Sequence, residues 1–312
     1  MIAARLVLGT AQWGGPYGIA NRGGPPVADE RARLLMLARA AGVRGLDTAR
    51  AYGESEQRIA AAMAATATCF TVGTKLAPDV CPPGASEAEV HARVEQSLLA
   101  SREALGVERL DALLLHRAAH REAAAGALWA RLRAERRAGR IGRLGVSAAS
   151  PAEAWDALAD PTVERVQVAA SLFDQRLLRT GFFAEAAARG VEVQVRSVFL
   201  QGAALLPPDA LPPALAALRP PLARVHAFAA AHALPLPALL LGFAAAVPGV
   251  ALVIGVECAA QLGAHLRADA AIARAARLQQ ELAVLVPPLP ETVLDPWRWQ
   301  NAASPHQSRE LA

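Results

Sequence analysis

Lys75 is the only lysine in this chain of 312 residues, and the other 31 members of the Lys and Arg class are arginines. Where a basic side chain only supplies surface charge, this sequence uses arginine. Lysine differs in having a pKa that burial can shift and a compact head that fits beside a single oxygen atom. Tyrosine is equally scarce, with only Tyr17 and Tyr52. A single lysine at the end of the run FTVGTK therefore indicates a chemical role.

Three other side chains capable of proton chemistry stand in matching places. Asp47 ends the run VRGLDT, His116 ends LDALLLH, and Tyr52 follows Asp47 in DTARAYGESE. Each has an ordinary structural explanation, as a turn cap, a satisfied histidine or a packed aromatic. If all these runs are parallel strands of one barrel, their carboxyl ends share a rim. A carboxylate, an ammonium, an imidazole and a phenol would then meet, which favours an active site.

The elements that must position these residues alternate regularly along the chain. Eight strand-like runs are expected at 5–10, 43–48, 70–75, 110–116, 141–147, 163–169, 191–197 and 250–255. Helical patterns lie near 28–41, 54–65, 86–105, 122–138, 151–159, 175–189, 222–232 and 259–267. This count predicts a single α/β domain, a (β/α)8 TIM barrel. An open doubly wound sheet is disfavoured because GTAQWGG does not fit GxGxxG after the first strand.

Helix-end signals support this alternation. Ser86 with Glu89 forms a capping box, and Ser150 precedes a first-turn proline. Glycines suited to helix C-termini follow four of the segments, at Gly42, Gly106, Gly139 and Gly190. The Pro-rich stretch 205–222 predicts a long loop. We expect residues 1–285 to form the barrel and residues 286–312 a C-terminal arm over the active-site face.

Composition excludes several other classes of function. The net charge of +4 comes from arginines spread along the chain, and the run at 131–140 is typical of a solvated helix face. No nucleic-acid partner is expected. Three separated cysteines predict neither a metal site nor a disulfide. The N-terminal apolar run is too short for a signal peptide, and prolines break the apolar stretch 236–254. We therefore expect a cytoplasmic protein without a membrane span.

The chain resembles the aldo-keto reductase family along nearly its whole length. The resembling segments are GTAQWGGPYGIAN (9–21), GLDTARAYGESE (45–56), VGTK (72–75), RLDALLLH (109–116), IGRLGVS (141–147), VQ (166–167), RSVFLQG (196–202) and VIGVECAAQLGAHL (253–266). The resemblance implies an NAD(P)-dependent oxidoreductase that interconverts a carbonyl and an alcohol by hydride transfer. It also implies a catalytic tetrad of Asp47, Tyr52, Lys75 and His116.

In that tetrad Tyr52 would donate the proton to the carbonyl oxygen. A free phenol has a pKa near 10, and the charge of Lys75 is expected to lower it. Asp47 would hold Lys75, and His116 would orient the carbonyl oxygen. A barrel lyase that uses Lys75 for a Schiff base is one alternative. A cofactor-binding regulatory subunit with little turnover is another.

The resemblance further implies where NAD(P)(H) binds. Ser147 and Gln167 would bind the nicotinamide carboxamide, and Arg196 would stack on the ring or contact phosphate. The rest of the cofactor would be held by Ser197, Leu200, Gly202, Gly255, Glu257, Gln261 and His265. Relatives that choose NADPH often carry cations at the places of Glu257 and Gln261, which argues against a strong NADPH preference. Two alternatives would allow NADPH: Arg267 swings across to the phosphate, or Glu257 points to solvent as a first-turn helix carboxylate.

The substrate pocket is assigned to aromatic residues of two segments. Trp13 and Tyr17 in the first loop would wall it, while Trp297 and Trp299 would either close it or anchor the C-terminus. The first loop looks like that of reductases acting on sugars or sugar-derived intermediates. The expected substrate is therefore a small carbonyl compound or a sugar.

Overall fold

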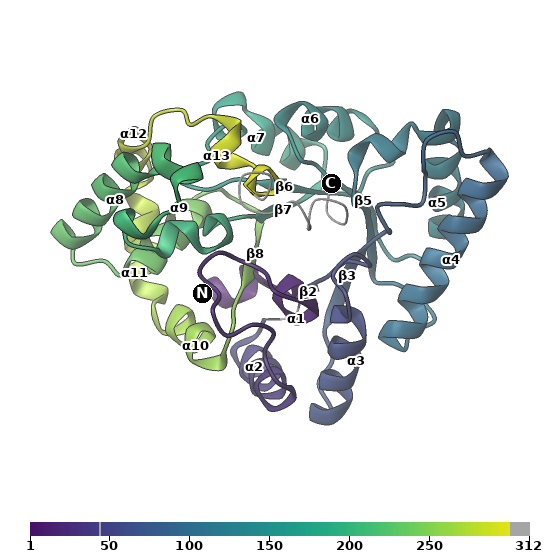
Figure 1. Ribbon diagram of the computed structural model, residues 1–312, viewed down its shortest axis with the longest axis horizontal. Coiled ribbons are helices and arrows are strands. Elements are labelled where there is room, and N and C mark those ends of the chain that lie inside the picture. The colour runs from purple at the N-terminus through teal and green to yellow at the C-terminus, as the bar shows by residue number, and fades with distance from the viewer. Residues whose placement is uncertain (44, 300–312) are drawn as a thin grey trace.

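The computed structural model describes residues 1–43 and 45–299 of the protein. Eight parallel strands close into one barrel in chain order, with the last pairing with the first (Figure 1). They are β1 Leu6–Gly9, β2 Gly45–Asp47, β3 Thr71–Lys75, β4 Ala112–Leu115, β5 Leu144–Ser147, β6 Arg165–Ala169, β7 Glu192–Arg196 and β8 Ala251–Gly255. Each lies inside a predicted strand run, so the predicted (β/α)8 barrel is confirmed.

Helices surround the barrel (Figure 1). They are α1 Ala11–Gly14, α2 Ala28–Ala41, α3 Ser55–Thr66, α4 Glu87–Leu105, α5 Ala127–Arg137, α6 Pro151–Ala159, α7 Phe182–Ala188, α8 Arg219–Ala231, α9 Leu236–Ala245, α10 Ala259–Arg267, α11 Asp269–Arg277, α12 Gln279–Leu285 and α13 Glu291–Leu294. Every predicted helical segment overlaps one of them, whereas α1, α9, α11, α12 and α13 were not predicted. Helix α9 is apolar almost all round and largely buried, so it lacks the amphipathic period that identifies a surface helix.

Local signals in the sequence account for several helix ends. The Ser86 hydroxyl accepts a bond from the Glu89 N–H at 3.3 Å, and the Glu89 carboxylate accepts one from the Ser86 N–H at 2.8 Å, which is the predicted capping box. The four predicted C-terminal glycines all have positive φ. The stretch 205–222 is not a plain loop, because it holds 3-10 turns at Pro208–Ala210 and Pro213–Leu218 and the start of α8.

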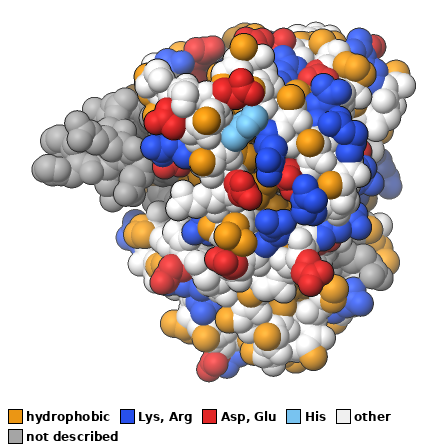
Figure 2. Space-filling view, turned by 90° about the vertical axis from the view of Figure 1, so that its right-hand side faces the viewer, with side chains coloured by type: hydrophobic (Ala, Val, Ile, Leu, Met, Phe, Trp, Pro, Cys, Tyr) orange, Lys and Arg blue, Asp and Glu red, His pale blue; other side chains and the backbone are white. Residues whose placement is uncertain are grey.

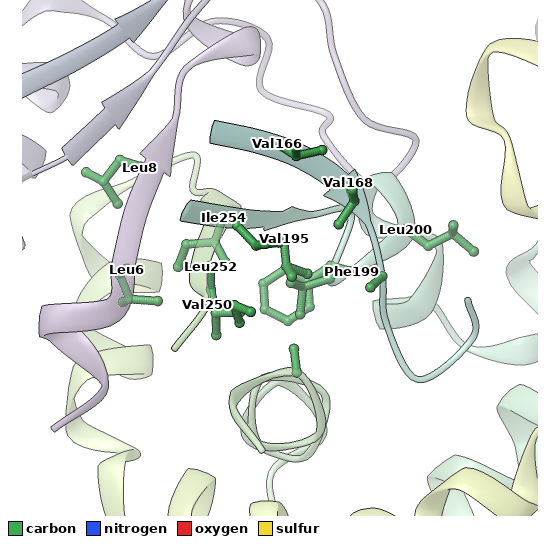
Figure 3. Close-up of a cluster of buried hydrophobic side chains, with 14 of the residues drawn as sticks. Leu6, Leu8, Val166, Val168, Val195, Phe199, Leu200, Val250, Leu252 and Ile254 are labelled. Atoms are coloured by element: carbon green, nitrogen blue, oxygen red, sulfur yellow. The ribbon is translucent and has the colours of Figure 1, made fainter. Parts of the chain in front are cut away.

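Successive side chains of each strand point to opposite faces, and here the two faces differ in polarity. On one face Val195, Leu252 and Ile254 gather with Phe199 in an apolar cluster (Figure 3). On the other face the strand register sets Ser147 beside Gln167, and Gln167 beside Gln194. The apolar face of the strands packs into the core. Polar side chains can therefore occupy the opposite face, near the rim of the barrel.

The molecular face that carries α4 and α5 gathers arginines with carboxylates among them (Figure 2). Arg131 and Arg140 both pair with Glu135, at 3.1 and 2.5 Å, and Arg136 pairs with Glu164 at 2.8 Å. The partly exposed Arg136–Glu164 pair contributes only about 0–1 kcal/mol, whereas the Glu135 carboxylate is buried. The run at 131–140 thus lies on a helix face crossed by ion pairs.

The C-terminal segment packs against the barrel through residues 286–299. The Trp299 indole donates to the Val293 carbonyl at 3.1 Å, and the Arg176 guanidinium, in the loop after β6, pairs with Asp295 at 3.3 Å.

In the described part of the chain no single helix is long and apolar enough to cross a membrane, although the bent pair Pro213–Ala231 and Leu236–Ala245 meets that length and composition together. Among the same residues no cluster of three His, Cys, Asp or Glu side chains could hold a metal ion.

Candidate active site

A buried ion pair joins the ends of β2 and β3. The Lys75 Nζ lies 2.9 and 2.8 Å from the two carboxylate oxygens of Asp47 and 3.0 Å from the carbonyl oxygen of Thr48. Lys75 is 1% exposed and Asp47 is 5% exposed. An ammonium has three N–H donors, and all three find acceptors here, which offsets the cost of burying the charge. These three contacts hold the nitrogen in place between β2 and β3.

Tyr52 lies against this ion pair in the turn between β2 and α3. The Lys75 Nζ is 5.1 Å from the centroid of the Tyr52 ring. The His116 imidazole meets the same ring edge-on, with centroids 5.9 Å apart. The three side chains that the sequence placed at strand ends and the phenol of the following turn are therefore neighbours in space.

Two glycines allow the first loop to approach this turn. A Cβ atom added at Gly14 would lie 1.6 Å from the Tyr52 carbonyl oxygen, and one added at Gly53 would lie 2.5 Å from the Gly14 carbonyl oxygen. Gly53 also has a φ of 51°, in the left-handed region that favours glycine. The backbone of the first loop and the Tyr52 turn are thus in direct contact.

Burial has the largest effect on the pKa of the Tyr52 phenol and on that of the His116 imidazole. The pKa of the Tyr52 phenol is raised by burial and by the Asp47 carboxylate, and the Arg196 charge opposes the rise. The predicted net fall of this pKa is therefore not found, because burial has the largest effect and raises it. Burial and then the Lys75 charge lower the pKa of His116 to about 3. At neutral pH the phenol and the imidazole are both uncharged.

A cavity of about 700 Å³ opens beside Tyr52. Most of the predicted cofactor residues line it. Among the predicted site residues, those on its wall are Tyr17, Asp47, Tyr52, Gln167, Arg196, Ser197, Gly202, Gly255, Glu257, Gln261 and His265. Lys75 and His116 are not on the wall, and Lys75 lies behind Asp47. Ser147 is buried at the end of β5, beside Gln167 in the register.

Gln167 carries an unsatisfied acceptor. Its Nε2 donates to Asp47 Oδ1 at 2.7 Å and to Gln194 Oε1 at 3.1 Å, whereas its own Oε1 is buried and has no partner among the described residues. A buried carbonyl oxygen without a donor is costly, so this atom suits a ligand that brings an N–H group, such as a carboxamide. Gln194 was not identified from the sequence, although a glutamine inside the apolar run VEVQVR was a signal for it.

The backbone after β7 is in an unusual conformation where it borders the cavity. Ser197, Leu200, Gln201 and Gly202 all have positive φ, between 48° and 89°. A Cβ atom at Gly202 would lie 2.7 Å from that of Ala20. The Leu200 and Gly202 N–H groups already donate to the carbonyls of Ser197 and Phe199, both at 2.9 Å. An anion such as phosphate would therefore have to bind through other backbone N–H groups of this segment. The Leu200 side chain does not line this path, because it is fully buried in apolar surroundings (Figure 3).

The Glu257 carboxylate lies on the cavity wall near the start of α10. The Gln261 side chain accepts a bond from the Glu257 N–H at 2.8 Å and contacts the Glu257 carboxylate at 3.4 Å. Glu30 of α2 accepts a bond from the Ala259 N–H at 2.5 Å, at the start of α10. The sequence alone did not identify Glu30, because it is separated from Ala259 by 229 positions. His265 stacks on Phe199 with ring centroids 5.5 Å apart.

The four aromatic residues that were predicted to line the substrate pocket have different outcomes. Trp13 is 1% exposed and lies in the core, so its assignment to the substrate pocket is wrong. Trp299 is buried and bonded to Val293, which fits the alternative of an anchor for the C-terminus. The side chain of Trp297 lies outside the described residues. Tyr17 lines the cavity, and burial raises the pKa of its phenol to about 12.

Comparison with known proteins assigns this arrangement to a family. The model of the aldo/keto reductase family matches residues 5–271. A candidate aldo-keto reductase from Pseudomonas aeruginosa has the same fold, with a TM-score of 0.62 at 22% identity over 87% of this chain and 90% of that one. A thermostable aldo-keto reductase bound to the inhibitor epalrestat gives a TM-score of 0.62 at 19% identity, over 90% of this chain and 94% of that one. No curated protein sequence matches the chain significantly.

Proposed function

Because the chain belongs to the aldo/keto reductase family, we propose that it interconverts a small carbonyl compound and its alcohol with Tyr52 as the group that exchanges the proton. The observation that carries this proposal is the buried Lys75 ammonium, bound by both oxygens of Asp47 and 5.1 Å from the Tyr52 ring centroid. When bound, the nicotinamide cofactor supplies or accepts the hydride.

Tyr52 is suited to hold a proton until it is needed. Its raised pKa keeps the phenol protonated at neutral pH, so it can protonate an oxygen that gains negative charge. General acid help of this kind is worth about 10²–10⁴ in rate. The fixed charge of Lys75 stabilises negative charge at the same oxygen without reorganising during the reaction.

His116 is suited to orient the carbonyl oxygen. Its low pKa leaves the imidazole neutral, so one ring nitrogen carries hydrogen and the other does not. The ring is edge-on to Tyr52, and a substrate oxygen that meets the phenol would also be near the imidazole. A neutral donor there positions the oxygen without competing with Tyr52 for the proton.

The cavity wall fits a nicotinamide dinucleotide. The partnerless Gln167 Oε1 would accept from a carboxamide, and the left-handed segment at 197–202 would receive phosphate through backbone N–H groups. Glu257 and Glu30 add negative charge near the start of α10, which disfavours an extra phosphate there. We therefore propose that the enzyme has no strong preference for NADPH and favours NADH.

Titration with NADH and NADPH, followed by an aldehyde and sugar screen, tests this function. Tyr52→Phe is measured beside the wild type. We expect cofactor binding by both proteins and turnover by the wild type alone. Cofactor binding without turnover of any carbonyl or alcohol would instead favour a regulatory subunit. Borohydride trapping of substrate on Lys75 would favour a Schiff-base lyase, which the three acceptors around its nitrogen disfavour.

A further inference from the structure

Arg196 is the only Lys or Arg among the described residues that line the cavity. It is the last residue of β7, and its guanidinium reaches across to the end of β5. There Nη2 donates to the Ala148 carbonyl at 3.0 Å, while Nη1 contacts the Ser197 hydroxyl at 3.3 Å. Both contacts are with neutral oxygens, so they orient the guanidinium without balancing its charge.

No carboxylate among the described residues forms an ion pair with Arg196, and this distinguishes it from Lys75. A guanidinium has five N–H donors in a planar fork that matches carboxylate and phosphate oxygens. The two contacts above leave donors free at the wall of the cavity. A half-buried cation with open donors is a favourable partner for an anionic ligand group.

The guanidinium is also close to the reacting groups. Its positive charge acts on Tyr52 and Tyr17, lowering the pKa of each phenol against the effect of burial, and it lowers the pKa of His116. Arg196 and Tyr52 also line the same cavity. An anionic group bound by Arg196 therefore belongs to a molecule that can also reach Tyr52.

We propose that Arg196 binds an anionic group of the substrate, so that the preferred substrates are carbonyl compounds carrying a carboxylate or a phosphate. This inference rests on the proposed function. The same chemistry could serve a phosphate of the cofactor, and the test below separates these two sources. The guanidinium would select among substrates and would not itself exchange the proton.

Two aldehydes of nearly equal shape provide the test: 4-formylbenzoate, which is anionic, and 4-formylbenzamide, which is neutral. The readout is the ratio of their kcat/KM values, in which any common effect of a substitution cancels. We expect the wild type to prefer the anion and Arg196→Met to lower this ratio by about 10- to 100-fold, the value of a charged hydrogen bond. Arg196→Lys should keep most of the preference. Arg39→Met, at an exposed arginine of α2, is the matched control.

Three results would overturn the proposal. The ratio could be unchanged in Arg196→Met, or could fall equally in Arg39→Met. Alternatively, Arg196→Met could weaken NADH binding, measured by fluorescence, while leaving the aldehyde ratio as in the wild type; the anion would then be a cofactor phosphate. The proposed function fails only if no compound of the aldehyde and sugar screen is turned over. If these two aldehydes are not turned over, calorimetric binding of both to the wild type and to Arg196→Met still tests the inference.

Discussion

The Lys75 Nζ faces the phenol ring of Tyr52, 5.1 Å from the ring centroid. Its three N–H groups donate hydrogen bonds to the Asp47 carboxylate and the Thr48 carbonyl. The lysine is thus a fixed charge under the ring. Its small head matters because the three acceptors lie at 2.8 to 3.0 Å around one nitrogen.

Lys75→Arg is expected to remove most reductase activity while the fold survives. A planar guanidinium cannot place one atom among the same three acceptors, so Asp47 and Tyr52 would lose their arrangement. We expect kcat to fall by at least about 10²-fold. Steady-state kinetics with one good aldehyde measures this, and circular dichroism checks the fold. A folded variant that kept more than about a tenth of wild-type kcat would contradict the role of Lys75.

Tyr52→Phe should abolish turnover and leave cofactor binding almost intact. The change removes only the hydroxyl, and the ring still packs against His116. Fluorescence titration should give a dissociation constant for NADH within a few-fold of that of the wild type. Substantial activity in this variant would disprove the mechanism unless the other cavity phenol replaces Tyr52. The double variant with Tyr17→Phe tests that exception.

His116 should make the protein less stable in acid. Its pKa is about 3 in the folded protein and near 6.5 when unfolded, so the unfolded chain binds more protons between these values. Its contribution is present above pH 6.5 and is lost as the pH falls, by about 2–3 kcal/mol at pH 4.5. The free energy of unfolding, measured with urea, should fall between pH 7.5 and 4.5 by this much less in His116→Gln than in the wild type. The control His91→Gln, on α4, should match the wild type, and an equal loss in all three proteins would refute the prediction.

Cofactor choice should respond to two carboxylates near the start of α10, Glu257 on the cavity wall and Glu30 of α2. We expect kcat/KM with NADPH not to exceed that with NADH. Glu257→Gln, and then Glu30→Gln added to it, should shift the ratio toward NADPH by about 10- to 100-fold in total, since like charges at several ångströms repel by about 1–3 kcal/mol. The amide oxygen introduced by Glu30→Gln can still accept from the Ala259 N–H, so the helix start is kept. A wild-type preference for NADPH above about a hundredfold would show that these carboxylates do not set the choice.

Gly14→Ala should impair the enzyme although Gly14 bears no reactive group. The added methyl would lie 1.6 Å from the Tyr52 carbonyl oxygen, so the loop or the turn must move. We expect kcat to fall by at least about 10-fold, because small displacements of catalytic groups are costly. Gly15→Ala is the control, since a Cβ there meets nothing within 4 Å. Equal activity in the two variants would show that the contact does not position Tyr52.

The proximity of Asp47, Tyr52, Lys75 and His116 could be predicted because each depends on one short run of sequence. Asp47 and Lys75 are the last residues of strands whose apolar patterns are legible, and parallel closure then brings them together. Contacts between side chains from distant segments could not be predicted from the sequence. Glu30 reaches α10 across 229 positions, and Gln194 supports Gln167 from the next strand.

Two errors have the same physical origin, which is burial. Trp13 follows a strand in a loop-like sequence, yet it turns into the core, and only the packed structure reveals which side of a four-residue helix is covered. The pKa of Tyr52 was expected to fall because a cation lies near it. The sequence contains no measure of desolvation, and desolvation has the largest effect on this group.

The contact between Gly14 and the Tyr52 turn also has a consequence for exchanging parts between relatives. The two segments touch through backbone atoms, so neither can be transplanted without its counterpart. A chimera that takes residues 10–22 from another member should take residues 48–58 from the same parent. Recombination breakpoints that separate the two segments would join mismatched surfaces, and such hybrids should be recovered as folded but inactive barrels.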